Sequence, residues 1–106
     1  VAGNVGPALT ARNARFLREF CGRESVPVHA GCERPLLRPA IAADHVHGES
    51  GLGPLQVSEP AAPLAAGHAV QFIVDTLLRE PAGSVTLAVT GPMTNVALAL
   101  RLAPDI

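Results

Sequence analysis

SVTLAVTGPMTN, residues 84–95, is the stretch that decides the fold predicted for this chain. Residues 84–90 are nearly apolar throughout, as expected of a parallel strand that is covered on both faces. The turn GPMTN then leads into an apolar helix predicted over 96–103, which Pro104 ends. A buried strand that leads through a short turn into a helix is typical of an α/β fold.

Two more elements are predicted on the N-terminal side of that strand. Residues 66–80 carry apolar side chains at helical spacing, and Pro81 stops the predicted helix. VPVHAG, residues 26–31, is short, β-branched and closed by a glycine, which predicts a strand. The apolar stripe of the helix consists of Val70, Ile73, Val74, Leu77 and Leu78.

The first predicted helix covers residues 9–21, LTARNARFLREFC. Phe16, Leu17, Phe20 and Cys21 share one face, and arginines and Glu19 surround the other. Thr10 is a candidate cap for its start and Gly22 for its end. Residues 38–63 are rich in Gly, Pro, His and Ser, so we expect a long irregular stretch, and such loops are usually functional or disordered.

The predicted order of helices and strands indicates an α/β fold with a parallel sheet. The chain has 106 residues, of which 48% are hydrophobic and 16% charged, which suits a packed domain rather than a disordered segment. Two strands cannot form a sheet that covers three apolar helices. We therefore expect residues 1–106 to be part of a larger α/β domain.

Composition excludes several classes of protein. The formal net charge is −1 and no basic patch stands out, so nucleic-acid binding is not expected. No apolar run approaches the roughly 20 residues that span a membrane, and the N-terminus lacks the features of a signal peptide. Cys21 and Cys32 have no zinc-type spacing, and we expect buried, reduced thiols in a cytoplasmic protein.

Ligands of open α/β sheets bind outside the carboxyl ends of the strands. Three segments of this chain qualify: residues 2–5 after a presumed strand, the loop containing 44–53, and residues 90–95. Asn4 could hold sugar hydroxyls because its amide both donates and accepts, or it could be a turn residue. The Thr90 carbonyl could serve a hard cation, or the segment could simply cap a helix through Thr94.

HVHGESG, residues 45–51, has four interpretations. The H-x-H pair with Glu49 could bind zinc. Ser50 could be a nucleophile beside a histidine, although no strand-turn-helix elbow surrounds it. A glycine-rich lid that carries one functional histidine, His47, is the interpretation we favour. The fourth is a solvated loop without a role.

Taken in order, these motifs resemble the inosine–uridine (purine and pyrimidine) nucleoside hydrolases along essentially the whole chain. The resemblance implies a parallel-sheet, Rossmann-like fold. It also implies calcium-dependent cleavage of the N-glycosidic bond of ribonucleosides to ribose and free base, in purine and pyrimidine salvage. The matching segments are VAGNV (1–5), TARNA (10–14), VPVHAG (26–31), RPLLRP (34–39), HVHGESGLG (45–53), the helix beginning HAV (68–70) and TLAVTGPMTNVALAL (86–100).

The resemblance also implies roles for three residues. Asn4 matches the asparagine that contacts ribose hydroxyls. Thr90 matches the threonine whose main-chain carbonyl binds calcium. His47 matches the histidine of a mobile active-site loop that closes near the nucleoside, so HVHGESGLG, residues 45–53, is named the flap below. Closure of such a loop excludes water from the reacting sugar, apart from the attacking molecule.

One departure from the family pattern limits these expectations. The family's N-terminal D-x-D-x-x-x-D-D cluster is absent, and Asp44, Asp75 and Asp105 are far apart in sequence. We therefore expect this chain alone to bind calcium poorly and to lack hydrolase activity, whereas the intact parent would be a homo-oligomeric enzyme. The alternatives are a non-catalytic α/β module that binds a nucleoside or a partner chain, and a small H-x-H-x-E zinc protein. Base preference does not follow from the resemblance.

Overall fold

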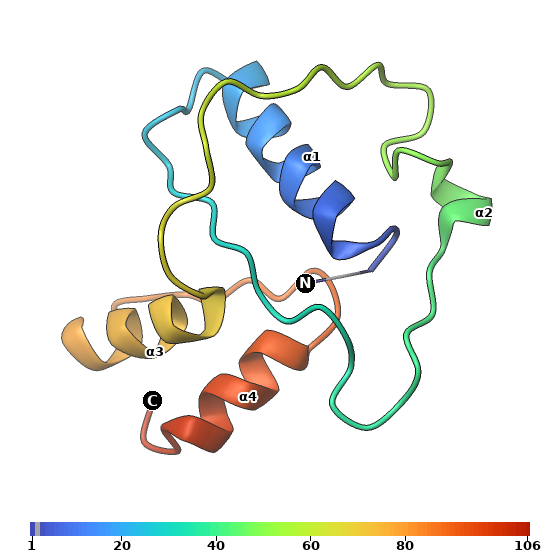
Figure 1. The fold of residues 1–106 in the computed structure, drawn as a ribbon. Coiled ribbons are helices and arrows are strands. Elements are labelled where there is room, and N and C mark those ends of the chain that lie inside the picture. The colour runs from blue at the N-terminus through green and yellow to red at the C-terminus, as the bar shows by residue number, and fades with distance from the viewer. Residues whose placement is uncertain (2) are drawn as a thin grey trace.

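The computed structural model describes Val1 and residues 3–106 of the chain, and the regular elements of this part are helices (Figure 1). They are α1 (Pro7–Phe20), α2 (Asp44–His47), α3 (Ala69–Arg79) and α4 (Thr94–Leu102). The three long helices agree with the predicted ones to within three residues at each end. The long connection before α3 is irregular, as predicted, apart from the single turn of α2.

Helix α1 begins earlier than the sequence suggested. Pro7 occupies its first turn, where a missing N–H costs nothing, and Gly6 stands at the N-cap position. Thr10 is therefore not the cap. Its hydroxyl instead donates to the Pro7 carbonyl at 3.0 Å, inside the helix.

The end of α1 is the predicted one. Gly22 has φ +62°, a left-handed conformation that glycine adopts without a Cβ penalty. The amides of Gly22 and Arg23 donate to the carbonyls of Glu19 and Arg18, each at 2.9 Å. These two bonds are the pair that closes a Schellman motif.

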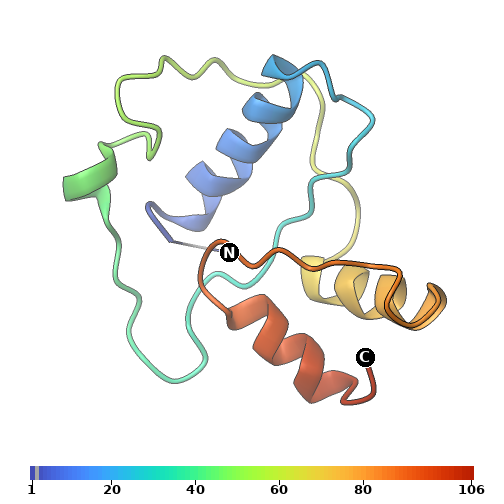
Figure 2. The same ribbon diagram turned by 180° about the vertical axis from the view of Figure 1, so that it is seen from behind.

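Helices α3 and α4 lie side by side in both views (Figures 1 and 2). Val70 and Val74 of α3 are buried against Ala99 of α4, which is fully covered. His68 caps α3 because its Nδ1 accepts from the Val70 amide at 3.2 Å. Pro81 follows the end of α3, as predicted, because the residue before a proline avoids helical geometry.

The start of α4 corrects a second capping prediction. Thr94 is the first residue of the helix and not its cap. Met93 holds the N-cap position and makes no capping hydrogen bond with its side chain. Thr94 is instead buried, with 9% of its surface exposed.

Neither predicted strand is a strand in the described part of the chain. The carbonyls of 26–31 are used elsewhere: Val28 accepts from the Ala65 amide at 2.9 Å, and Ala30 from the Ala69 amide at 2.7 Å. No described backbone hydrogen bond joins 26–31 to 84–90. A strand is defined by the ladder of backbone hydrogen bonds that it forms with a neighbouring strand. These two segments form no such ladder with any described residue, so they are irregular coil.

The expected burial of 84–90 is also wrong for this chain. In Figure 2 this segment is a coil that connects the end of α3 to the start of α4. Val85, Leu87 and Val89 keep 37%, 43% and 39% of their surface exposed. The described residues provide no layer on either side of the segment, so its apolar side chains remain at the surface.

Both cysteines are free thiols, as predicted, but one prediction about them fails. Cys21 is exposed rather than buried, because it lies at the C-cap of α1 next to Phe20, which is itself 72% exposed. Cys32 is partly buried and packs against the core formed by α3 and α4. Within the described residues, no helix has the length and apolar character needed to cross a membrane.

Candidate functional site

Two of the three predicted loops, residues 2–5 and 90–95, meet in the described structure. The segment that leads into the flap contacts the first of them. Gly3 faces Pro92 so closely that an added Cβ would lie 3.3 Å from the proline Cδ. The Asn4 carbonyl accepts from the Ala43 amide at 2.9 Å, two residues before the flap begins. These backbone contacts bring the segments together, and the convergence of their polar groups on one crevice stays a prediction. Ala2, which belongs to the predicted 2–5 stretch, lies outside the described residues.

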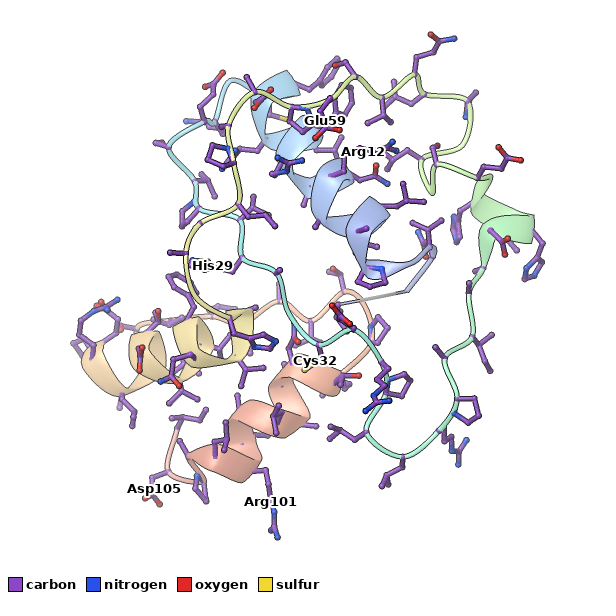
Figure 3. The ribbon with its side chains drawn as sticks, viewed as in Figure 1. Arg12, His29, Cys32, Glu59, Arg101 and Asp105 are labelled. Carbon is purple, nitrogen blue, oxygen red and sulfur yellow. The ribbon has the colours of Figure 1, made fainter. Side chains whose placement is uncertain are left out.

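A contact near this meeting point was not anticipated from the sequence. The Asn95 Oδ1 accepts from the Cys32 amide at 2.8 Å, and Cys32 lies beside the N-terminal end of α4 (Figure 3). A Cβ on Gly31 would lie 2.5 Å from the Asn95 Nδ2, so any larger residue would have to displace the Asn95 side chain. The sequence features that could have pointed to this contact are the glycine that closes VPVHAG and the asparagine of TGPMTN. Neither one indicates its partner.

The flap begins inside α2 and continues as a glycine-rich turn. His47 is the last residue of α2 and is half-buried. Gly48 has φ +76°, a conformation that ends the helix at once. The Gly53 amide donates to the His47 carbonyl at 2.8 Å and closes the turn. The flap is therefore a compact loop with internal hydrogen bonds.

The zinc interpretation of the flap is not supported by this geometry. His45 and His47 lie on a helix, where residues two apart point to different sides, and not on a strand. The described residues contain no group of three His, Cys, Asp or Glu side chains that could hold a metal ion. The nucleophile interpretation also lacks support, because the Ser50 hydroxyl accepts from the Leu52 amide at 3.2 Å as part of the turn.

The structure places the three predicted site residues on three different segments. Asn4 and Thr90 are exposed, and His47 is half-buried. Backbone contacts link Asn4 to the flap through Ala43, and Thr90 lies shortly before Pro92, which Gly3 faces. These contacts bring the backbones together, and they leave the roles of the three side chains as predictions.

The cavities of the described residues do not enclose a nucleoside site around these positions. A cavity of about 50 Å³ lies next to Pro92, between Pro35 and Ile41, and has room for little more than water. A larger hollow of about 480 Å³ lies between α1 and residues 28–33, and it is lined by Ala8, Ala11 and Ala14 on the helix side. Asn4, His47 and Thr90 line neither of them.

The residues present do not make a complete calcium site. Calcium takes six to eight oxygen ligands, several of them from carboxylates. The predicted contribution of this chain is a single neutral oxygen, the Thr90 carbonyl, and the described residues hold no cluster of acidic side chains beside it. We therefore derive no chemical step through a metal ion from these residues.

Comparison with known proteins identifies the family. The family model described as "Inosine-uridine preferring nucleoside hydrolase" matches residues 1–106. The chain is 40% identical over 109 aligned residues to the inosine-uridine preferring nucleoside hydrolase of Crithidia fasciculata, covering 100% of this chain and 34% of that protein. It is 44% identical to a pyrimidine-specific ribonucleoside hydrolase of Salmonella enteritidis, covering 99% of this chain and 33% of that protein.

A solved structure agrees with these matches. The purine-preferring ribonucleoside hydrolase from Gardnerella vaginalis superposes with a TM-score of 0.89 at 28% identity, over 97% of this chain and 34% of that one. This chain therefore spans about a third of the length of the curated relatives it matches. The resemblance to the fold of nucleoside hydrolases is thus supported, although the described residues contain no sheet. The chain belongs to the inosine-uridine preferring nucleoside hydrolase family.

Proposed function

We propose that this chain forms about a third of a ribonucleoside hydrolase domain that cleaves the N-glycosidic bond, giving ribose and a free base. Family membership over residues 1–106 supports this proposal. The observation that carries it is the meeting of the Asn4 segment with Ala43 before the flap and with Pro92 after Thr90. Loops at the carboxyl ends of parallel strands form the binding crevice of such folds.

In this proposal Asn4 and His47 act on the nucleoside from two sides. The Asn4 side chain is exposed, and its amide can donate to one ribose hydroxyl and accept from another. His47 approaches from the flap. The flap would exclude water from the reacting sugar, apart from the one molecule that attacks it. Protonation of the leaving base is the remaining acid–base task, and it is suited to a histidine near neutral pH.

Nucleoside hydrolases bind a metal ion. We propose that this metal is calcium, that the Thr90 carbonyl supplies one ligand, and that the remaining oxygens come from the parts of the domain outside these 106 residues. When bound, the ion would orient the sugar and acidify water. The proposal includes weak calcium binding and no turnover for the 106-residue chain on its own.

The sheet of the domain is also proposed to be completed by those parts. Residues 84–90 resemble a strand covered on both faces, yet Leu87 is 43% exposed here. Because this chain superposes on about a third of a nucleoside hydrolase, neighbouring strands and covering helices would come from the rest of that fold. The homo-oligomeric state expected for the intact protein would involve surfaces that only the complete domain presents.

Base preference is proposed to lie mainly outside this third of the domain. The relatives that share it are named for inosine and uridine, for pyrimidines and for purines. A segment common to enzymes with three different preferences is better suited to reading the ribose, which all these substrates share.

A chimeric enzyme tests the proposal. The 106 residues replace the matching third of the Crithidia fasciculata relative, and release of reducing sugar from inosine and uridine is measured with calcium present. We expect turnover by the chimera, loss of most of it in Asn4→Ala and His47→Ala, and none by the 106-residue chain alone. Reproducible turnover by the isolated chain would contradict the proposal. A folded chimera that binds nucleoside without cleaving it would favour the non-catalytic module.

A further inference from the structure

One buried polar side chain of α1 has no part in the site described so far. Asn13 is 6% exposed, although asparagine is usually found at the surface. Its Nδ2 donates to the Ser50 carbonyl at 2.6 Å, and its Oδ1 accepts from the Arg12 Nη2 at 3.2 Å. The arginine thus orients the amide so that its N–H group points at the flap.

The next residue of the flap, Gly51, lies so close to Val5 and Asn13 that a side chain there would collide with them. Gly51 is buried, and a Cβ there would lie 2.7 Å from Val5 Cγ2 and 3.4 Å from Asn13 Nδ2. Its φ of +79° is a conformation that other residues adopt at a cost. The flap therefore touches the segment after Asn4 and the first half of α1 through a close, polar and steric contact.

Hydrogen bonds on both sides of His47 tie this stretch of the chain to the N-terminal segment and α1. At the front, the Ala43 amide donates to the Asn4 carbonyl at 2.9 Å. At the back, the Ser50 carbonyl accepts from Asn13. Between them stands His47, whose carbonyl is held by the Gly53 amide. Two ties on either side of His47 leave it less freedom than a loop attached only at its ends.

We infer that Asn13 is a positioning residue, which holds the flap so that His47 keeps a defined place relative to Asn4. The inference rests on the proposed function for its catalytic meaning, but its structural content does not depend on it. Asn13 touches no substrate. It acts on the reaction through the Ser50 carbonyl, and its loss leaves this partly buried carbonyl without its donor.

The first test uses the 106-residue chain and residue-resolved amide hydrogen exchange. Asn13→Asp keeps the shape and the contact with Arg12 but removes the donor. We expect the amides of Gly51 and Gly53 to exchange about tenfold faster, as for the loss of one buried hydrogen bond. Unchanged exchange at both amides would overturn the inference. So would an equal increase throughout α3 and α4, which would indicate general destabilisation.

Asn95→Ala is the matched control for this measurement. It removes an asparagine that also reaches a distant backbone group, the Cys32 amide, but not one in the flap. We expect exchange at Gly51 and Gly53 to stay as in the unmodified chain. Acceleration equal to that of Asn13→Asp would show that any lost side-chain contact loosens the flap, and the specific role of Asn13 would be refuted.

A second variant tests the same contact without changing Asn13. Gly51→Ala forces a methyl group against Val5, so the Ser50 carbonyl should move away from the Asn13 amide. In the nitrogen–proton NMR spectrum of the unmodified chain, one Asn13 side-chain proton should be shifted downfield and protected from solvent. This signature should disappear in Gly51→Ala. A signature that is absent from the unmodified chain, or that persists in the variant, would overturn the inference.

The kinetic consequence is measured in the chimera. Asn13→Asp should lower kcat about tenfold through misplacement of His47, with KM changed by less than about twofold because Asn4 still binds ribose. An unchanged kcat in an active chimera would contradict the positioning role. An inactive parent chimera would instead count against the proposed function, while the exchange and NMR results would still decide the structural inference.

Discussion

Helices α3 and α4 pack through buried apolar side chains, whereas α1 is held by its polar ones. Val70 and Ala99 are 3% and 0% exposed at the contact between α3 and α4. On α1, Arg18 is 8% exposed and donates to the carbonyls of Val26 and Ala62 at 3.0 and 3.3 Å. The apolar face of α1 is less covered, and Phe20 is 72% exposed.

The segment 59–62 supplies most of the polar contact with α1. Glu59 pairs with Arg15 at 2.7 Å, and Figure 3 shows it on the side of α1 near Arg12. The Glu19 carboxylate accepts from the amides of Ala61 and Ala62 at 3.2 and 2.8 Å. The side of α1 that carries the arginines and Glu19 is thus covered by this loop.

The difference shows that an apolar pattern alone does not bury a segment, because burial also needs a second apolar surface that packs against it. The described residues bring both partners of the α3–α4 contact, so that contact forms. They place no layer over the apolar face of α1 or over residues 84–90, and Leu17 and Leu87 are 39% and 43% exposed. Exposed apolar surface of this kind is typical of sites of interaction.

The largest expected effect on the free energy of unfolding distinguishes the packed α3–α4 contact from the uncovered residues 84–90. Val70→Asp buries a charge in the α3–α4 contact and should lower the free energy of unfolding by about 3 kcal/mol or more. Leu87→Asp makes the same kind of change at a position with equal apolar character in the sequence, and should cost within about 0.5 kcal/mol. Urea unfolding followed by circular dichroism measures both. Equal losses would contradict the division into a packed and an uncovered region.

The next effect tests whether polar contacts hold α1. Arg18→Ala removes two hydrogen bonds from a charged, buried group and should cost about 2 kcal/mol in the same unfolding experiment. Arg101→Ala near the end of α4 is the control, because Arg101 is exposed, and should cost less than about 0.5 kcal/mol. Similar values for the two variants would mean that the Arg18 contacts add no net stability.

A smaller effect concerns the end of α1. Gly22→Ala places a Cβ on a residue with φ +62°, which should cost about 1 kcal/mol of unfolding free energy. Gly91→Ala is the matched control, since Gly91 has no such φ and open space around its Cβ position. Thermal unfolding of both variants provides the comparison. A Gly91→Ala loss as large as that of Gly22→Ala would argue against a specific role for the left-handed cap.

The smallest effect is a pH dependence at the contact between α1 and 59–62. Hydrogen bonds from the Ala62 and Ala61 amides, together with Arg18 and Arg15, lower the pKa of the Glu19 carboxyl below its ordinary 4.5. A lowered pKa means that the contact contributes fully above 4.5 and is lost as the pH falls through the folded-state value. Carbon NMR of the carboxyl should give a midpoint below 4.5.

The same titration has a built-in check. In Glu19→Gln the amide oxygen can still accept a hydrogen bond but does not titrate, so the Ala62 amide shift should lose its acid transition. A Glu19 midpoint at or above 4.5 would show that the carboxylate does not hold the 59–62 segment in solution.

The helices could be predicted from sequence, because their signals are local. The spacing of Val70, Ile73 and Val74, the stop at Pro81 and the glycine at position 22 all act within one or two turns. Two capping predictions were wrong, since Thr10 lies inside α1 and Thr94 is the first residue of α4 rather than its cap. Capping depends on the backbone geometry just before the helix, which residue type alone does not determine.

For the candidate site, the sequence indicated which segments take part but not which hydrogen bonds hold them together. The rule for α/β folds led to the prediction that the polar groups of these loops converge, and the structure shows contacts between the segments. Asn13 and Asn95 were not singled out, because an asparagine in a helix or a turn is usually explained locally. Their partners, Ser50 and Cys32, are distant in the chain.

The sequence by itself determined the family, the three long helices and the segments that carry Asn4, His47 and Thr90, because these depend on local spacing and on ordered motifs. Only the tertiary structure decided which apolar faces are covered and which loops are tied together. Burial and long-range hydrogen bonds require both partners to be present, and the described residues supply them for α3 with α4 and for the flap with Asn13, but not for residues 84–90.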